Sequence, residues 1–272
     1  MSTSQIYRLG FIGAGKLAGS VIRGLIRAKF CPPDEIIASE PNEQTRTALQ
    51  KESEVSVTAE NAEVAEKAEV IFIGVKPAIV LPVLQELSDN LKHKLLISLA
   101  GGVRISSMEK VANARFMRAL TNTPAAICSA ATGIARGTRT TKEDVDLMKK
   151  IFGAIGVVVE VEEAQIDAVT ALSGSGPAFI YTVIEALAKG GTKMGLSDDV
   201  ALELATQTAL GAAALMQESK MSPEELRKMV VTPGGTTAAG LAVMEKLGTS
   251  ESLVAAVEAA AKRGQEMAKE NS

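Results

Sequence analysis

The hydrophobic pattern of this chain changes its period near residue 163, and this change constrains the fold more than any other feature. Before it, short runs of β-branched and apolar residues alternate with stretches of helical spacing, whereas after it only helical spacing remains. Because alternating strands and helices form a mostly parallel sheet with helices on both faces, the pattern predicts an α/β fold with a doubly wound sheet over residues 1–162. An all-α domain is expected over residues 163–272.

Short strands are expected throughout the first domain, with helices between most of them. The strands are expected at residues 6–12, 35–39, 55–57, 70–75, 95–99, 115–120, 130–135 and 157–161. The sequence VIFIGV at residues 70–75 is a continuous apolar run, which is typical of a parallel strand that is buried on both faces. The order of the strands and the direction of the last two stay open.

A glycine turn follows the first predicted strand. Gly13, Gly15 and Ala18 form a G-x-G-x-x-A pattern, and apolar residues recur at helical spacing after it. In a dinucleotide-binding fold the first glycine makes the turn, the second lets the backbone approach a pyrophosphate, and the small third residue lets the helix pack on the strand. The positive end of the helix then faces the phosphates. The pattern therefore predicts a cofactor site, and the alternative is a tight turn without a ligand.

The second predicted strand ends at Ser39 and Glu40, which are cofactor candidates. An acidic residue at this place accepts hydrogen bonds from the adenosine ribose of NAD, and it repels the 2'-phosphate of NADPH. Arg46 could offset this repulsion, and a Glu40 that faces solvent would exert little of it. NADPH and NADH both stay open, and we expect Glu40→Ser to shift the preference toward NADPH.

Two further loops are cofactor candidates, because open α/β sheets bind ligands beyond the carboxyl ends of their strands. Val75, Lys76 and Pro77 end one buried strand. Ala100 and Gly101 follow the next strand, where the backbone can approach a nicotinamide. The alternative for Lys76 is a surface cation with no ligand.

The stretch from Leu172 to Gly191 joins the two regions. Its small residues at Ser173–Gly176 predict a turn, and Pro177 suits the first position of a helix. This helix is apolar on nearly every face, so it must be covered on nearly every face. We expect it to lie between two subunits, and the alternative is a buried helix within one subunit.

A second glycine turn, VTPGGTT at residues 231–237, opens another predicted helix. The N-terminus of such a helix can bind a carboxylate through free backbone N–H groups, with the hydroxyls of Thr236 and Thr237 beside them. The alternative is a helix that starts with a threonine cap. Ser222 and Glu225 predict a capping box for the helix before this turn.

Composition excludes several classes of function. A net charge of −3 with both signs interspersed offers no basic surface for nucleic acid or an anionic membrane. His93 is the only histidine and lies in a polar turn, so neither a Ser-His-Asp triad nor a metal site is predicted. Cys31 and Cys128 are expected to be unpaired thiols in a reducing compartment. The opening residues lack a secretory signal and no apolar run is long enough to span a bilayer, so we expect a cytoplasmic protein with a small-molecule partner.

Six motifs together make the chain resemble pyrroline-5-carboxylate reductase over essentially its whole length. They are GFIGAGKLA at residues 10–18, GVKP at 74–77, TNTPAA at 121–126, DAVTALSGSGPAF at 167–179, ALAKGGTKMGL at 186–196 and VTPGGTT at 231–237. The resemblance implies a Rossmann-like N-terminal domain and a helical domain that interleaves with a second subunit in a homodimer, often assembled into a homodecamer. It also implies NADPH- or NADH-dependent reduction of 1-pyrroline-5-carboxylate to L-proline, the last step of proline biosynthesis.

The resemblance also assigns roles to single residues. Together with Ser39 and Glu40, the cofactor groove that it implies comprises Ile12, Gly13, Ala14, Gly15, Lys16, Leu17, Asn61, Gly74, Val75, Lys76, Pro77, Leu99, Ala100 and Gly101. Asn61 matches a position that contacts the adenosine side. Gly235, Thr236 and Thr237 match the loop that holds the substrate carboxylate. The hydroxyl of Thr237, the catalytic candidate, matches the one beside the ring nitrogen, where we expect a hydrogen-bond partner rather than an indispensable acid. Many NADPH-using relatives carry a small polar residue in place of Glu40, which keeps the coenzyme choice open.

Two other functions compete with this one. A β-hydroxyacid dehydrogenase also pairs a Rossmann domain with a helical one, but it uses a catalytic lysine on the helix after a glycine turn, and Gly176–Ile184 contains no lysine. A module that senses NAD(P)H without turnover is the second alternative, and the intact VTPGGTT loop argues against it.

Overall fold

A computed structural model of the chain describes residues 6–271. Residues 1–5, which belong to the opening stretch that we expect to lack a secretory signal, lie outside the described part. The chain forms two compact units. One holds the chain up to Ser175 together with the segment that begins at Glu258, and the other holds Gly176–Val257.

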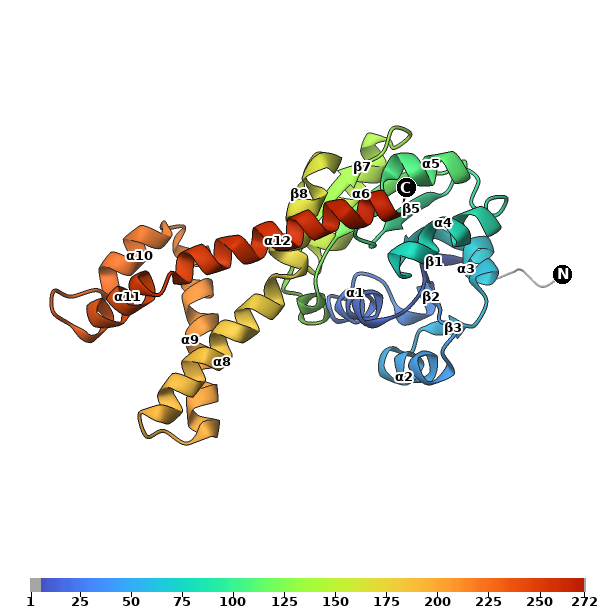
Figure 1. The fold of residues 1–272 in the computed structure, drawn as a ribbon. Coiled ribbons are helices and arrows are strands. Elements are labelled where there is room, and N and C mark those ends of the chain that lie inside the picture. The colour runs from blue at the N-terminus through green and yellow to red at the C-terminus, as the bar shows by residue number, and fades with distance from the viewer. Residues whose placement is uncertain (1–5, 272) are drawn as a thin grey trace. The chain divides into compact units, whose positions relative to one another are not determined.

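An eight-stranded sheet forms the middle of the first unit, in the order β3-β2-β1-β4-β5-β6-β7-β8 (Figure 1). The strands are β1 (Tyr7–Ile12), β2 (Ile36–Ser39), β3 (Ser56–Thr58), β4 (Ala68–Ile73), β5 (Leu95–Ser98), β6 (Arg115–Leu120), β7 (Ala130–Arg136) and β8 (Gly156–Glu160). All the predicted strands are present, and the prediction of a Rossmann-like sheet is confirmed. Strands β1 to β6 are parallel, β7 is antiparallel to β6, and β8 is parallel to β7, which answers what the sequence left open.

Helices cover both faces of this sheet, and a separate hydrophobic core lies on each face. The helices are α1 (Lys16–Arg27), α2 (Glu43–Ser53), α3 (Asn61–Lys67), α4 (Pro77–Glu86), α5 (Ile105–Val111) and α6 (Lys142–Gly153). On one face Phe11 and Phe72 stack, with ring centroids 4.6 Å apart, beneath α1 and α6. The sequence did not predict the short helix α5, which packs Ile105, Met108 and Val111 against one of these cores.

The predicted turn at Ser173–Gly176 is wrong. Helix α7 (Ile166–Val169) continues into a π-helical turn, η4 (Thr170–Gly174), and Ser175 keeps right-handed helical angles up to the start of α8 (Gly176–Lys193). The Ser173 hydroxyl donates to the carbonyl of Val169, at 2.9 Å, and so satisfies a helical carbonyl. The small residues therefore permit a wider helical turn rather than end the helix.

The second unit is all helical, as predicted. It consists of α8, α9 (Asp198–Ser219), α10 (Pro223–Val230), α11 (Thr236–Lys246) and the first turns of α12 (Thr249–Glu270). The predicted capping box of α10 is confirmed. The Ser222 hydroxyl accepts the N–H of Glu225 at 3.3 Å, and the Glu225 carboxylate accepts the N–H of Ser222 at 2.8 Å.

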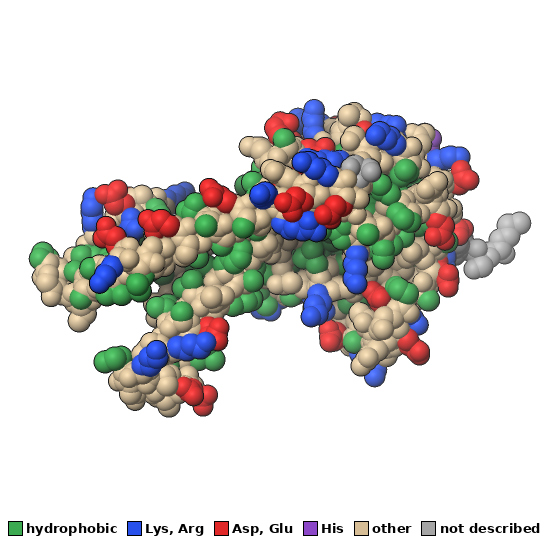
Figure 2. Space-filling view, viewed as in Figure 1, with side chains coloured by type: hydrophobic (Ala, Val, Ile, Leu, Met, Phe, Trp, Pro, Cys, Tyr) green, Lys and Arg blue, Asp and Glu red, His purple; other side chains and the backbone are tan. Residues whose placement is uncertain are grey.

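The second unit has almost no core of its own. Helices α8 and α9 approach closely at Gly191, where an added Cβ would lie 3.2 Å from the Ala201 side chain. Its buried apolar cluster consists of Ala188, Ala201 and Ala205. Large apolar side chains are exposed instead, among them Leu187, Leu202, Leu204, Leu210, Leu215 and Met229. Figure 2 shows such side chains along the helical unit. The alternative in which α8 is an ordinary helix buried within one subunit is therefore wrong.

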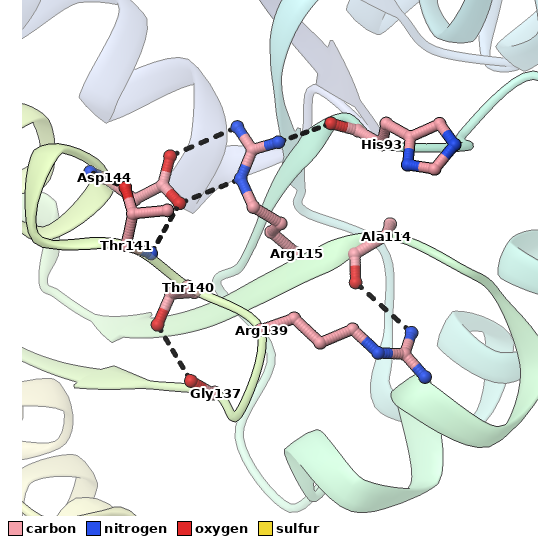
Figure 3. A network of polar contacts seen from close by, with 8 residues as sticks. All are labelled: His93, Ala114, Arg115, Gly137, Arg139, Thr140, Thr141 and Asp144. Atoms are coloured by element: carbon pink, nitrogen blue, oxygen red, sulfur yellow. Dashed lines mark hydrogen bonds and ion pairs between the residues drawn. The ribbon is translucent and has the colours of Figure 1, made fainter.

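A network of hydrogen bonds connects the amino end of β6 to α6 and to the loop before β5 (Figure 3). Arg115 donates to both carboxylate oxygens of Asp144, at 2.8 and 3.1 Å, and also to the carbonyl of His93. Asp144 accepts the N–H of Thr141 as well, as part of the capping box of α6. Because β5 and β6 are parallel, this network lies at the edge opposite to their carboxyl ends, so it supports the fold.

In the described part of the chain, no helix combines the length and the apolar character that crossing a membrane requires. Residues 6–271 also contain no group of three or more His, Cys, Asp or Glu side chains that could hold a metal ion. His93 is exposed, and Cys31 and Cys128 are free thiols, as predicted. Burial raises the pKa of the Cys31 thiol.

Candidate functional site

The predicted cofactor residues follow strands whose carboxyl ends are in register. Ile12, the last residue of β1, pairs with Ser39 at the end of β2 and with Ile73 at the end of β4. Ile73 in turn pairs with Ser98, at the end of β5. The loops that follow these four strands therefore leave the sheet side by side. We call this edge of the first unit the nucleotide edge, because it is where doubly wound sheets bind nucleotides.

Backbone hydrogen bonds tie these loops to one another. The N–H groups of Gly13 and Ala14 both donate to the carbonyl of Ser39, each at 3.0 Å. The N–H of Gly74 donates to the carbonyl of Ile12 at 2.8 Å. The loops after β1, β2 and β4 thus form one connected platform.

Two glycines let the loops after β1 and β4 touch. Gly13 has a φ of +85°, and a Cβ there would lie 2.6 Å from the side chain of Val75. A Cβ at Gly74 would lie 2.4 Å from the carbonyl oxygen of Gly13. Neither glycine can be replaced without moving the neighbouring loop. Gly15 differs from both, because a Cβ there would meet no atom within 4 Å.

The space in front of Gly15 is open. Gly15 is the N-cap of α1 and offers no side chain, so no side chain caps the first N–H groups of this helix. Lys16, which is exposed, adds a positive charge at the first helical position. A pyrophosphate can accept hydrogen bonds from N–H groups at a helix start, and the missing side chain leaves room for its approach.

The residues predicted for the adenosine side lie next to this platform. Buried Ser39 donates its hydroxyl to the Oδ1 of Asn61, at 2.7 Å, which fixes the Asn61 side chain at the first position of α3. Glu40 is half-buried, and its Oε1 accepts the N–H of Asn42 at 3.1 Å. The structure thus brings the predicted cofactor residues together at the nucleotide edge.

The loop after β5, Leu99–Gly101, has a support that the sequence did not reveal. An added Cβ on Gly102 would lie 2.7 Å from the Cβ of Met267 in α12, and Asn271 donates to the Gly102 carbonyl at 3.3 Å. The last turns of α12 therefore pack on this loop. Asn271 and Gly102 are 169 positions apart, and no local pattern could connect them.

Arg104, which follows this loop, belongs to a charge cluster in which Arg118 and Asp167 are buried. It lies 3.4 Å from Asp167, while Arg118 of β6 is fully buried and lies 3.5 Å from Glu163. Glu163 also accepts the N–H of Ile105 at 2.6 Å. Burial lowers the pKa of Arg118, and the carboxylates of Glu163 and Asp167 oppose that effect. Sequence reasoning missed this cluster, because its members come from separate elements and share no spacing.

The predicted substrate loop belongs to the second unit. Gly234 has a φ of +70°, which favours glycine, and a Cβ at Gly235 would lie 2.3 Å from the Thr232 Oγ1, so a side chain there would displace Thr232. Gly235 is the N-cap of α11 and no side chain caps this helix, so the alternative of a threonine cap is wrong. Within residues 6–271 the hydroxyls of Thr236 and Thr237 make no hydrogen bond. They remain available to a ligand, as do the first N–H groups of α11.

Two family profiles match the chain. The profile described as pyrroline-5-carboxylate reductase dimerisation matches residues 163–267. The profile described as NADP oxidoreductase, coenzyme F420-dependent, matches residues 8–102. The second match contains the loops after β1, β2, β4 and β5.

Several proteins match over nearly the full length. A pyrroline-5-carboxylate reductase of Glycine max is 41% identical over 266 residues, which cover 97% of this chain and 97% of the relative. The crystal structure of a Plasmodium falciparum pyrroline carboxylate reductase with NADP bound is 29% identical, with a TM-score of 0.88 and coverage of 96% of this chain and 98% of that one. A pyrroline-5-carboxylate reductase structure from Coxiella burnetii is 34% identical, with a TM-score of 0.87 and coverage of 97% and 99%.

Proposed function

This chain belongs to the pyrroline-5-carboxylate reductase family, and from that membership we propose how its residues carry the reaction. The chain is an oxidoreductase that acts on a C=N bond with NAD(P)H. It reduces 1-pyrroline-5-carboxylate to L-proline, the last step of proline biosynthesis. Neither the β-hydroxyacid dehydrogenase nor the NAD(P)H-sensing module has comparable support.

The nucleotide edge holds the coenzyme in this proposal. The first N–H groups of α1 bind the pyrophosphate in front of Gly15, and Asn61 and Glu40 receive the adenosine side. The loops Gly74–Pro77 and Leu99–Gly101 line the remainder. The bound dihydronicotinamide supplies the hydride that reduces the C=N bond. One observation carries this assignment. The ends of four strands are in register, so the loops that follow them surround Gly15, in front of which no atom lies within 4 Å of an added Cβ.

The start of α11 holds the substrate. Its free N–H groups, the positive end of the helix and the Thr236 hydroxyl bind the carboxylate, which fixes the ring in one orientation. The Thr237 hydroxyl then forms a hydrogen bond with the ring nitrogen. Solvent can protonate a cyclic imine, so Thr237 orients that nitrogen rather than serving as an indispensable acid. Orientation is what the reaction asks of the protein, because hydride transfer needs two rings held face to face.

The helical region forms a dimer. We assign residues 163–272 to a domain for substrate binding and dimerisation, since the exposed apolar side chains of α8 and α9 offer the surface that such a contact buries. We propose that dimers assemble further into decamers. A cytoplasmic location is proposed as well, and the free thiols of Cys31 and Cys128 support a reducing compartment.

Substitution of Thr237 tests the substrate site. Thr237→Ala removes the hydroxyl beside the ring nitrogen, and we expect kcat/KM to fall about tenfold or more. This loss is smaller than the largest losses seen when a general acid is removed, about 10⁴-fold. Thr237→Ser keeps a hydroxyl and is expected to retain most of the activity. The measurement is the oxidation of NADH and of NADPH with 1-pyrroline-5-carboxylate. Wild-type activity of Thr237→Ala, with fold and dimer intact, would reject the role, and absence of turnover in the unmodified chain would favour the sensing module.

A further inference from the structure

Arg46 brings an unneutralised positive charge to the turn after β2. Its Nη1 donates to the carbonyl of Glu40 at 2.7 Å and to the carbonyl of Pro41 at 3.3 Å. Within residues 6–271 no carboxylate forms an ion pair with this guanidinium. One of its nitrogens is thus anchored to the backbone, and its charge and its remaining donors are free.

Glu40, the acidic residue of this turn, is engaged in the turn itself. Its Oε1 accepts the N–H of Asn42, and the Asn42 side chain in turn caps α2 by accepting the N–H of Thr45 at 2.8 Å. Glu40 and Arg46 therefore bring opposite charges to the same few residues. The repulsion that Glu40 alone would exert on a phosphate is offset by Arg46.

The first turn of α2 and the phosphate-binding turn line one groove. The groove between α1 and α2 is lined, among others, by Gly15, Lys16, Gln44 and Thr45. A ligand with its pyrophosphate at Gly15 therefore has its adenosine end within reach of the first turn of α2, where Arg46 follows Thr45. Arg23 also lines this groove, but it forms an ion pair with Glu52 at 3.2 Å.

We propose that Arg46 recognises the 2'-phosphate of NADPH, so that this chain binds the phosphorylated coenzyme although Glu40 ends β2. A guanidinium presents a planar fork of donors that matches phosphate oxygens. In Rossmann-type sheets, an arginine near the end of the second strand can bind the 2'-phosphate of NADPH. The two backbone carbonyls hold the guanidinium in place before the coenzyme arrives. This inference rests on the proposed position of the coenzyme at the nucleotide edge.

Binding of coenzyme fragments tests the assignment without turnover. The dissociation constants of 5'-ADP and of adenosine 2',5'-bisphosphate are measured by calorimetry for the full-length chain and for Arg46→Gln. We expect Arg46→Gln to weaken the bisphosphate by about tenfold or more and to leave 5'-ADP within about threefold, because only the 2'-phosphate meets the guanidinium. Arg46→Lys keeps the charge and loses the fork, so an intermediate loss is expected.

Two control variants separate the possible failures. Lys16→Gln is expected to weaken both fragments, because each carries a 5'-phosphate that meets the turn at Lys16. Glu40→Ser is expected to change the affinity for the bisphosphate by less than Arg46→Gln does. If Glu40 alone decides the coenzyme, Glu40→Ser instead tightens the bisphosphate strongly and Arg46→Gln changes nothing.

The outcomes distinguish this inference from the proposed function. If 5'-ADP binds and Arg46→Gln weakens both fragments equally, or neither, the role of Arg46 is overturned while the coenzyme site stands. If 5'-ADP does not bind to the unmodified chain, the position of the coenzyme itself fails. Added salt should weaken the bisphosphate more steeply in the unmodified chain than in Arg46→Gln, because a charge contact with a phosphate is screened.

Discussion

The two units of this molecule are stabilised in different ways. The first unit has a core on each face of its sheet, whereas the second buries three alanines and exposes many leucines, methionines and valines. Burying one large apolar side chain contributes about 1.5–3 kcal/mol, so we expect a dimer that buries these side chains to stabilise the second unit. The nucleotide edge lies on the self-sufficient unit and the proposed substrate loop on the dependent one. Coenzyme binding should therefore survive the loss of the partner, and turnover should not.

The largest expected effect comes from a charge placed on the exposed apolar surface of α9. Leu210 is 62% exposed in the single chain. Leu210→Glu would place two carboxylates in the apolar contact of a dimer, and we expect dissociation and a loss of kcat/KM of about a hundredfold or more. Light scattering after size exclusion measures the dissociation.

The same variant tests the contrast between the units. Binding of 5'-ADP by Leu210→Glu should stay within about threefold of the unmodified chain, because the coenzyme site has a core of its own. Gln217→Glu adds the same charge at an exposed polar position of α9 and is expected to leave the dimer and the activity intact. A dimeric and active Leu210→Glu would contradict the assignment of this surface.

A second prediction concerns the buried charges of the first unit. Arg118→Met leaves Glu163 without its cation and removes a positive charge near Asp167. We therefore expect the free energy of unfolding to fall by about 3 kcal/mol. Urea unfolding of the dimer at two protein concentrations measures the loss. The double variant Arg118→Met, Glu163→Gln removes both charges and should recover part of it. A loss below about 1 kcal/mol would mean that the cost of burying the unpartnered Nε and Nη2 of Arg118 already offsets most of the stability that its ion pair contributes.

The smallest expected effect, and the one with a defined pH dependence, comes from the network at the amino end of β6. Burial alone would raise the pKa of Asp144, but hydrogen bonds from Arg115 and from the Thr141 backbone outweigh burial and hold that pKa below its ordinary value. The carboxylate therefore contributes stability above its unfolded pKa, about 3.9, and this contribution is lost as the pH falls through the lower folded value.

Asp144→Asn tests this contribution. At neutral pH we expect it to reduce the free energy of unfolding by about 1–3 kcal/mol, since Arg115 loses its charged partner, the buried Asp144 carboxylate. The difference from the unmodified chain should shrink below about pH 4. Thermal or urea unfolding between neutral and acid pH measures it, and a difference that stays constant with pH would argue that the effect is steric.

The sequence predicts the nucleotide edge well because most of its parts have a local signal. Gly13 and Gly15 mark the turn, and the apolar run before Lys76 marks a buried strand, whereas the resemblance assigns Asn61. Parallel strands then bring these loops to one edge without further information. The sequence does not predict the choice of coenzyme in the same way, because that choice depends on where the side chains of Glu40 and Arg46 lie in the turn after β2.

Three features escape prediction because they depend on contacts between distant segments or on unusual helical geometry. The π-helical turn at Thr170–Gly174 has the composition of a loop, and only its hydrogen bonds show that the helix continues. The cluster around Arg118 combines residues from three separate stretches of the chain. The strong apolar character of α8 predicts that it is covered, but only the structure shows that its own chain does not cover it.

The packing of α12 on the loop after β5 has a practical consequence for anyone who purifies this enzyme. Asn271 and Met267 lie against Gly102, one residue beyond the proposed coenzyme contacts. A fusion partner joined directly after α12 would thus sit beside the proposed coenzyme loop. Turnover measured on such a fusion should be compared with that of a cleaved preparation before any substitution is judged.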